Sequence, residues 1–208
     1  HGQGKITQLC EGESFETRIA RLAAQLSGIE ETPEIGFCHD IGVTRRRDTF
    51  EFLRNERLVD AIEPFVGPEI AWNPVSHIRP KMPGTDVLFH QDAVFTTQDA
   101  APNLQLTVWV PLVDSTLENG CLQVLPGVHK NRTVYWTYNR DLPEIEKVSL
   151  PMKKGDVLFF HKLTPHGSGP NNTDMVRWSM DLRYQKTGEP SPRPEWPSCI
   201  VRSRSNSA

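Results

Sequence analysis

The sequence lacks the features of several large functional classes. Its 23 Lys and Arg residues are outnumbered by 26 Asp and Glu residues, so there is no basic excess of the kind that nucleic-acid binders normally carry. No apolar run approaches the roughly 20 residues that a membrane-spanning helix needs. No charged-then-apolar leader opens the chain. We therefore expect neither a nucleic-acid partner nor a membrane span.

Cysteine is scarce and scattered. Cys10, Cys38, Cys121 and Cys199 form no C-x-x-C pair, which argues against a disulfide scaffold or a structural zinc site. This usage favours a reducing compartment, and we predict a cytoplasmic location. The chain begins at His1 rather than Met, so we expect it to be a trimmed form of a longer protein, which leaves open whether a native targeting segment precedes it.

Glycine-rich nucleotide motifs are also missing: there is no βαβ dinucleotide fingerprint and no P-loop. What is present is enough apolar material for one core, since 37% of the 208 residues are hydrophobic and nine are Phe. We expect a single domain over 1–208, with a helical part to about residue 70, a β core over about 71–185 and a tail over 186–208.

Two amphipathic helices are expected in the first part. Ser14 can cap a helix that ends at Gly28. Asp48 followed by Glu51 resembles a capping box and predicts a second helix that ends at Gly67. Short strands follow, separated by Pro, Gly and Asn turns, and they predict a β-sandwich or small barrel with the helices packed on one sheet. The predicted strands are 71–79, 86–92, 104–112, 121–125, 146–150, 156–162 and 175–185. Within 104–112, Thr107 and Trp109 are expected to face one way and Leu106 and Val108 the other.

Three side chains could form a metal site. His90 and Asp92 are two positions apart, and on a strand such residues project from the same face. His166 follows a very apolar strand and precedes small residues that would let a ligand approach, whereas its rival His161 lacks that context. Two imidazoles and one carboxylate occupy one face of an octahedral ion and leave the rest open, as in non-haem Fe(II) oxygenases. A structural zinc site would be closed by four protein ligands.

Arg177 could complete this site. It lies 11 positions after His166, across a turn-rich stretch. If that stretch forms a hairpin, Arg177 lies on the antiparallel neighbour of the His166 strand and points into the same cavity. A guanidinium there can bind the distal carboxylate of a dicarboxylate through two hydrogen bonds. The alternative is a surface or ion-paired arginine.

Together these stretches resemble the phytanoyl-CoA dioxygenase family of Fe(II)- and 2-oxoglutarate-dependent oxygenases. The resemblance covers roughly residues 70 to 185 in the family's order. It is carried by four stretches, which are His90–Asp92, Glu118–His129, Gly155–Phe160 and His166–Asn171 continuing to Arg177. The family implies a double-stranded β-helix, a cupin-like jelly-roll barrel with the metal in its mouth.

The resemblance also implies roles for individual residues. His90, Asp92 and His166 would ligate Fe(II), and Arg177 would pair with the C5 carboxylate of 2-oxoglutarate. Further 2-oxoglutarate contacts are expected from Ser168 or Ser179 and from Trp109, with Thr107 and Asn73 as weaker candidates. His77 and Arg79 are candidates for substrate contact, with plain packing as the alternative. Arg183 could anchor the substrate, or it could form an ion pair with Asp181 or another acid.

The implied reaction uses O₂ and 2-oxoglutarate to oxidise a C–H bond of a small organic substrate, with release of succinate and CO₂. Hydroxylation is the leading expectation; desaturation, epoxidation and rearrangement use the same iron centre. A halogenase of this family would carry a small residue in place of Asp92. A non-catalytic metal-binding jelly roll is the alternative from another class. Neither the substrate nor the oligomeric state can be predicted.

Overall fold

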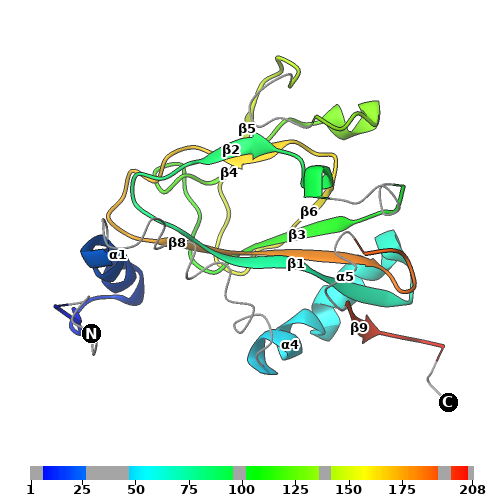
Figure 1. Ribbon diagram of the computed structural model, residues 1–208, viewed down its shortest axis with the longest axis horizontal. Helices are drawn as coiled ribbons and strands as arrows, with labels where there is room; N and C mark the ends of the chain where they lie inside the picture. Colours follow the sequence, from blue (N-terminus) through cyan, green and yellow to red (C-terminus); the bar gives the residue numbers. More distant parts are fainter. Residues whose placement is uncertain (1–6, 27–46, 96–101, 136–141, 192–197, 206–208) are drawn as a thin grey trace.

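The computed structural model describes residues 7–26, 47–95, 102–135, 142–191 and 198–205. Two antiparallel sheets face each other (Figure 1). The larger sheet has the order β6 (Leu158–His161), β3 (Leu106–Pro111), β8 (Arg177–Lys186), β1 (Ile70–Lys81) and β9 (Cys199–Arg202). The smaller sheet has the order β2 (Val87–His90), β7 (His166–Ser168), β4 (Leu122–Val124) and β5 (Val148–Leu150). The mainly β prediction is confirmed.

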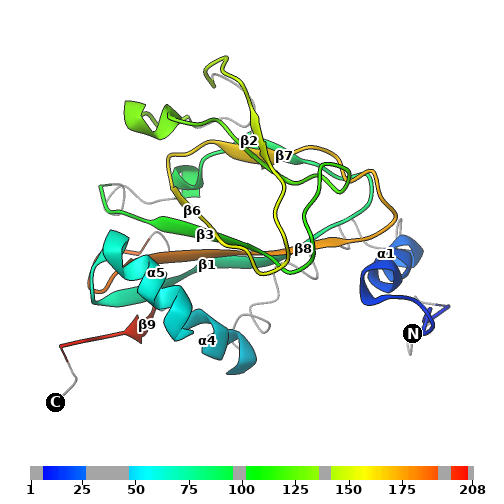
Figure 2. The ribbon, with the colours of Figure 1, turned by 180° about the vertical axis from the view of Figure 1, so that it is seen from behind.

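Helices cover the outer face of the larger sheet. α4 (Arg47–Leu53) and α5 (Glu56–Val66) lie on the side away from the smaller sheet, as Figures 1 and 2 show. They share one apolar core with alternate residues of the sheet, including Val108, Leu182 and Tyr184. The Tyr184 hydroxyl donates a 3.0 Å hydrogen bond to the Leu53 carbonyl at the end of α4. α1 (Phe15–Leu26) packs separately, against Val176 and Trp178.

The space between the sheets is only partly apolar. Trp109, Leu122 and Phe160 pack there. Other residues that project between the sheets from β1, β3 and β8 are polar or charged and buried, which is rare unless such groups are paired or bind a ligand. The predicted alternation on β3 is confirmed, because Leu106 and Val108 join the helix-side core while Thr107 and Trp109 face inward.

The first helix is confirmed with its predicted cap, whereas the second differs from its prediction. The Ser14 hydroxyl accepts a hydrogen bond from the Thr17 amide, as an N-cap should. The second segment forms two helices rather than one, and Asp48 lies inside the first of them, which begins at Arg47 and ends at Leu53. Asn55 caps the next helix, its side chain accepting from the Arg57 amide. The sequence carried this signal, since Asn is a preferred N-cap residue.

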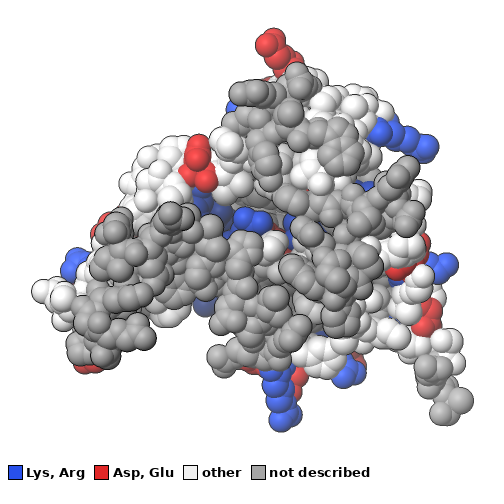
Figure 3. Space-filling model, in the orientation of Figure 1, with Lys and Arg blue, Asp and Glu red and all other residues white. Residues whose placement is uncertain are grey.

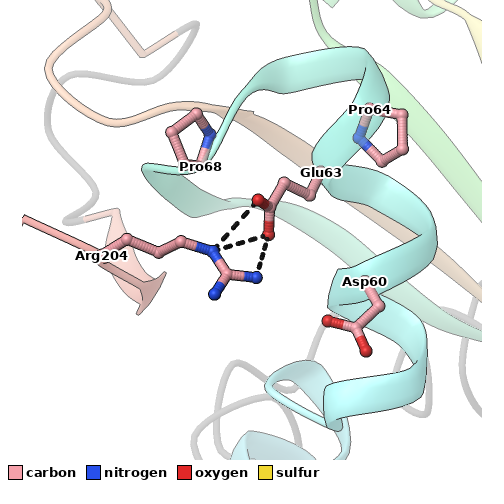
Figure 4. A pocket seen from close by; sticks show the side chains of 5 residues that line it. All are labelled: Asp60, Glu63, Pro64, Pro68 and Arg204. Carbon is pink, nitrogen blue, oxygen red and sulfur yellow. Dashed lines mark hydrogen bonds and ion pairs between the residues drawn. The ribbon is translucent and has the colours of Figure 1, made fainter.

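The tail forms a strand. β9 pairs with β1 at the edge of the larger sheet. Ion pairs then fix the tail to α5: the Arg202 guanidinium lies 2.7 Å from both Asp60 and Glu63, and Arg204 also binds Glu63 (Figure 4). These basic residues attach the edge strand β9 and the residues after it to α5, so we assign them a structural role.

Two further expectations concern the described residues. No helix among them is both long enough and apolar enough to cross a membrane. Cys10, Cys121 and Cys199 are free thiols, as the scattered cysteine pattern predicts. Cys38 and Gly28 lie outside the described residues.

A glycine on β7 allows the smaller sheet to pack. A Cβ atom at Gly167 would lie 2.7 Å from the Val87 carbonyl oxygen and 2.8 Å from the Phe89 ring, whereas a Cβ atom at Gly169 would meet nothing within 4 Å. We predict that Gly167→Ala lowers the free energy of unfolding by about 2 kcal/mol, because β2 and β7 must separate. Urea unfolding of Gly167→Ala and of the matched control Gly169→Ala checks this; equal losses would contradict it.

Candidate metal centre and anion pocket

Three predicted ligands converge. One ligand atom from each of His90, Asp92 and His166 lies within 4.8 Å of the others, and all three residues are buried. His90 ends β2, His166 begins β7, and these two residues pair in register. Their rings lie 4.4 Å apart between centroids. The smaller sheet therefore places the two imidazoles beside each other.

Hydrogen bonds to backbone carbonyls set the tautomer of both histidines. His90 Nδ1 lies 2.9 Å from the Leu88 carbonyl oxygen, and His166 Nδ1 lies 3.0 Å from that of Thr164. A carbonyl oxygen only accepts, so each Nδ1 carries the proton and each Nε2 is the nitrogen that can ligate a metal. Burial, together with the neighbouring His166, lowers the pKa of His90 to about 4. The His90 ring is therefore neutral at pH 7, as a ligand must be.

Asp92 is held by two partners. The Arg183 guanidinium forms a buried ion pair with Oδ1, and the Thr107 hydroxyl donates a 2.5 Å hydrogen bond to Oδ2. Burial alone would raise the pKa of Asp92, but Arg183, His166 and Thr107 hold it far below its ordinary value. The carboxylate is thus ionised and fixed in orientation.

The prediction that His90 and Asp92 share a strand face is wrong in its geometry. β2 ends at His90, and Asp92 begins the short 3₁₀ helix η1 (Asp92–Phe95). Gln91, between the two, is fully buried and bonds the Leu163 carbonyl and the Tyr135 amide. The turn into η1, and not strand pleating, brings the carboxylate to the histidines.

Arg177 lies in the same pocket, with unsatisfied donors. The pocket is lined by His90, His166, Trp109, Arg177, Ser168 and Ser179, among others. Arg177 is 4% exposed, and its Nε and Nη1 atoms make no hydrogen bond to a described residue. The same holds for the Ser179 hydroxyl. Burial lowers the pKa of Arg177 to about 10, so it stays cationic at neutral pH. Figure 3 shows Lys and Arg atoms within a hollow of the surface.

The prediction that the Arg177 strand pairs with the His166 strand is wrong. β8 belongs to the larger sheet and pairs with β1 and β3, whereas His166 lies on β7 in the smaller sheet. Arg177 therefore reaches the pocket from the opposite sheet. β7, with only three residues, was not predicted as a strand, because the strand predicted over 156–162 ends before it and the small residues after His166 indicated a turn-rich stretch.

Of the other residues predicted to contact 2-oxoglutarate, some line the pocket and others do not. The Trp109 ring centroid lies 5.2 Å from the Arg177 guanidinium carbon, and Ser168 lies at the end of β7 in the pocket wall. Thr107 instead donates to Asp92. Asn73 is fully buried and its amide bonds Gln185 and the Val75 amide, away from the pocket lining.

The predicted substrate residues lie on the inner face of β1 and β8. Arg79 lines the pocket and its Nε lies 2.5 Å from Asp181 Oδ2. His77 pairs in register with Asp181. Arg183 follows the ion-pair alternative, with Asp92 rather than Asp181 as its partner, and it also donates to the Val75 carbonyl.

Two features were missed from the sequence. The first is the Asp92–Arg183 pair, which joins residues far apart in the chain and has no local signal. The second is Lys81, buried at the end of β1, whose ammonium donates a 2.8 Å hydrogen bond to the Ser168 hydroxyl. Lys81 follows His77 and Arg79 at intervals of two, so strand alternation places it on the same face.

His161 is not part of the metal cluster of the described residues. Its ring stacks on His129 at 6.0 Å between centroids, and its Nδ1 accepts from the Leu163 amide. The preference for His166 over His161 thus agrees with the geometry.

Comparisons with known proteins agree with this geometry. The model of the phytanoyl-CoA dioxygenase (PhyH) family matches residues 27–179. Peroxisomal phytanoyl-CoA dioxygenase of Rattus norvegicus is 30% identical over 159 residues, which are 67% of this chain and 46% of that protein. The chain thus spans about half the length of the curated relatives it matches.

Solved structures confirm the fold class. Apo ThoJ, a non-heme monooxygenase, has a TM-score of 0.69 at 22% identity, with 95% of this chain and 78% of that chain covered. SnoN, a non-heme alpha ketoglutarate dependent epimerase from nogalamycin biosynthesis, has a TM-score of 0.54 at 27% identity over 67% of this chain and 56% of that chain. The fold is the double-stranded β-helix, although the two sheets of the described residues do not close into one hydrogen-bonded barrel.

The Asp92–Arg183 pair predicts a strong coupling between the two residues. In chelator-treated protein, Arg183→Met leaves a buried carboxylate unpaired and Asp92→Asn leaves a buried guanidinium unpaired. We expect each to lower the free energy of unfolding by about 3 kcal/mol. The double variant should lose much less than the sum of the two, which urea unfolding of all four proteins measures. Additive losses would show that the two side chains do not depend on each other.

Proposed function

The chain belongs to the phytanoyl-CoA dioxygenase family, and from this premise we propose that it is a non-haem Fe(II)- and 2-oxoglutarate-dependent oxygenase that hydroxylates a C–H bond of a small organic molecule. One observation carries the proposal. A cluster of two histidines and one carboxylate shares a pocket with a buried arginine whose donors are unsatisfied. The cluster supplies the ligands that an open Fe(II) site needs, and the arginine supplies the donors that a dicarboxylate co-substrate needs.

The donor set fits iron. His90 and His166 would bind through Nε2, and Asp92 through one carboxylate oxygen, while its Oδ1 also accepts from Arg183 and its Oδ2 from Thr107. Three ligands leave coordination positions for a co-substrate and O₂. When bound, the iron supplies the O₂ chemistry that couples decarboxylation of 2-oxoglutarate to succinate with oxidation of the substrate.

The pocket fits 2-oxoglutarate. Arg177 has donors without partners on Nε and Nη1, so its guanidinium can donate hydrogen bonds to the C5 carboxylate. Ser179 and Ser168 lie in the same pocket and have hydroxyl groups for further hydrogen bonds. Trp109 stacks near the guanidinium and, with Leu122 and Phe160, keeps this end of the space between the sheets dry.

Asp92 supports hydroxylation over halogenation. A carboxylate in that coordination position leaves no place there for a halide. Desaturation, epoxidation and rearrangement would use the same residues, so product analysis must separate them from hydroxylation. Release of succinate with consumption of O₂ separates all of these from a non-catalytic metal-binding protein. The cytoplasmic location stays a prediction from the cysteine pattern.

The metal assignment is tested with a matched pair of histidine variants. We predict that His166→Ala loses most of its bound iron, because one of three ligands is gone, and that His161→Ala retains it. Iron per polypeptide after anaerobic loading and desalting, measured by mass spectrometry, gives the result. Retained iron in His166→Ala together with lost iron in His161→Ala would refute the assignment.

The co-substrate assignment is tested at Arg177. A lysine cannot make the paired hydrogen bonds of a guanidinium, so Arg177→Lys should weaken 2-oxoglutarate binding by at least about 10-fold. Iron binding should change little, which serves as the internal control. Calorimetric titration of the anaerobic iron-loaded proteins measures the first, and metal analysis the second. Identical 2-oxoglutarate titrations for wild type and variant would contradict this role.

A further inference from the structure

Two buried cations face each other across neighbouring strands of the larger sheet. Lys81 on β1 and Arg177 on β8 pair in register, and each residue is 4% exposed. Like charges directly opposite on one sheet face destabilise the pairing. Among the described residues, neither side chain forms an ion pair with a carboxylate. An anion bound between the two groups would offset this repulsion.

The hydrogen bond of Lys81 determines what Ser168 can do. The ammonium has only donors, so in the 2.8 Å contact the Ser168 oxygen is the acceptor. The proton of the Ser168 hydroxyl must then point elsewhere. Because Ser168 lines the pocket with Arg177, that proton is available to an anion bound by Arg177. Lys81 thus makes Ser168 a donor toward the pocket.

The fold makes room for Lys81. Gly120 has φ +70°, and a Cβ atom there would lie 2.6 Å from Lys81 Cε. The Asn171 amide donates to the Lys81 carbonyl at 3.0 Å and fixes the end of β1. Burial, and then the charge of Arg177, lower the pKa of Lys81 to about 8, although Asp86 acts in the opposite direction. The cation is therefore held in a place that disfavours its charge until an anion arrives.

We propose that Lys81 is a second cation of the distal-carboxylate site, which orients Ser168 as a donor and matches the pocket to a 2-oxo dicarboxylate rather than a 2-oxo monocarboxylate. This inference rests on the proposed function. The charges agree with it. Arg79 is paired with Asp181 and Arg183 with Asp92, whereas Arg177, which lines the pocket, and Lys81, which bonds the pocket residue Ser168, have no ion-pair partner among the described residues. 2-Oxoglutarate is a dianion.

The test compares two ligands. 2-Oxopentanoate has the carbon chain of 2-oxoglutarate without the distal carboxylate. We expect wild type to prefer 2-oxoglutarate, and Lys81→Met to bind 2-oxoglutarate about 10-fold more weakly while its affinity for 2-oxopentanoate is unchanged. Lys81→Arg should recover part of the preference. Calorimetry on anaerobic iron-loaded protein measures all of these affinities, and iron content should not change. Lys153→Met, at an exposed lysine, is the matched control.

Ser168→Ala gives a second route if Lys81→Met does not fold. Removing the hydroxyl should reduce the same preference, and with Ser168 absent, Lys81→Arg should have little further effect. Equal losses for both ligands, or an unchanged preference in the Lys81 and Ser168 variants, would overturn the role of Lys81 while 2-oxoglutarate binding by wild type stands. Failure of wild type to bind 2-oxoglutarate at all would instead overturn the proposed function, and this inference with it.

Discussion

The buried ion pair between Asp92 and Arg183 is the interaction on which the site depends. Asp92 lies two residues after the end of β2 in the smaller sheet, whereas Arg183 lies in β8 of the larger one. Thr107 on β3 reaches the same carboxylate. A single carboxylate thus ties the two sheets together at the point where the two histidines converge. In an interior of low dielectric, removing either member of such a pair leaves an uncompensated charge, so the position of Asp92 is strongly determined before any metal binds.

The interior between the sheets combines apolar and charged side chains. Trp109, Leu122 and Phe160 pack there as in any β-sandwich. Charged residues of β1 and β8 also face inward, with Arg79 beside Asp181. The helix-side core supplies the hydrophobic stabilisation that this polar interior cannot, because α4 and α5 bury the outer face of the same strands. One sheet therefore serves two purposes, with stability on one face and chemistry on the other.

Strand alternation and motif spacing predicted much of the site. The pattern on β3 placed Thr107 and Trp109 inward, and the glycine context favoured His166 over His161. The same reasoning failed where the chain leaves regular strand geometry. Asp92 reaches the histidines through the turn into η1. Between β6 and β8, which belong to the larger sheet, the three-residue β7 pairs in the smaller sheet. The pairs Asp92–Arg183 and Lys81–Ser168 join residues 91 and 87 positions apart, so only the tertiary fold determines them.

The four inward-facing cations of β1 and β8 have different partners, and the partner indicates whether a cation has a structural role or a binding role. Arg79 and Arg183 each lie against a carboxylate, so their charge is satisfied within the protein. Lys81 and Arg177 lie against each other and toward hydroxyl groups, which accept hydrogen bonds but carry no charge. Two neighbouring positive charges without a carboxylate destabilise the folded protein. Such a destabilising arrangement is retained in proteins when ligand binding requires it. In the proposed site, the metal-binding end is therefore balanced before any ligand arrives, while the carboxylate-binding end is complete only when an anion occupies it.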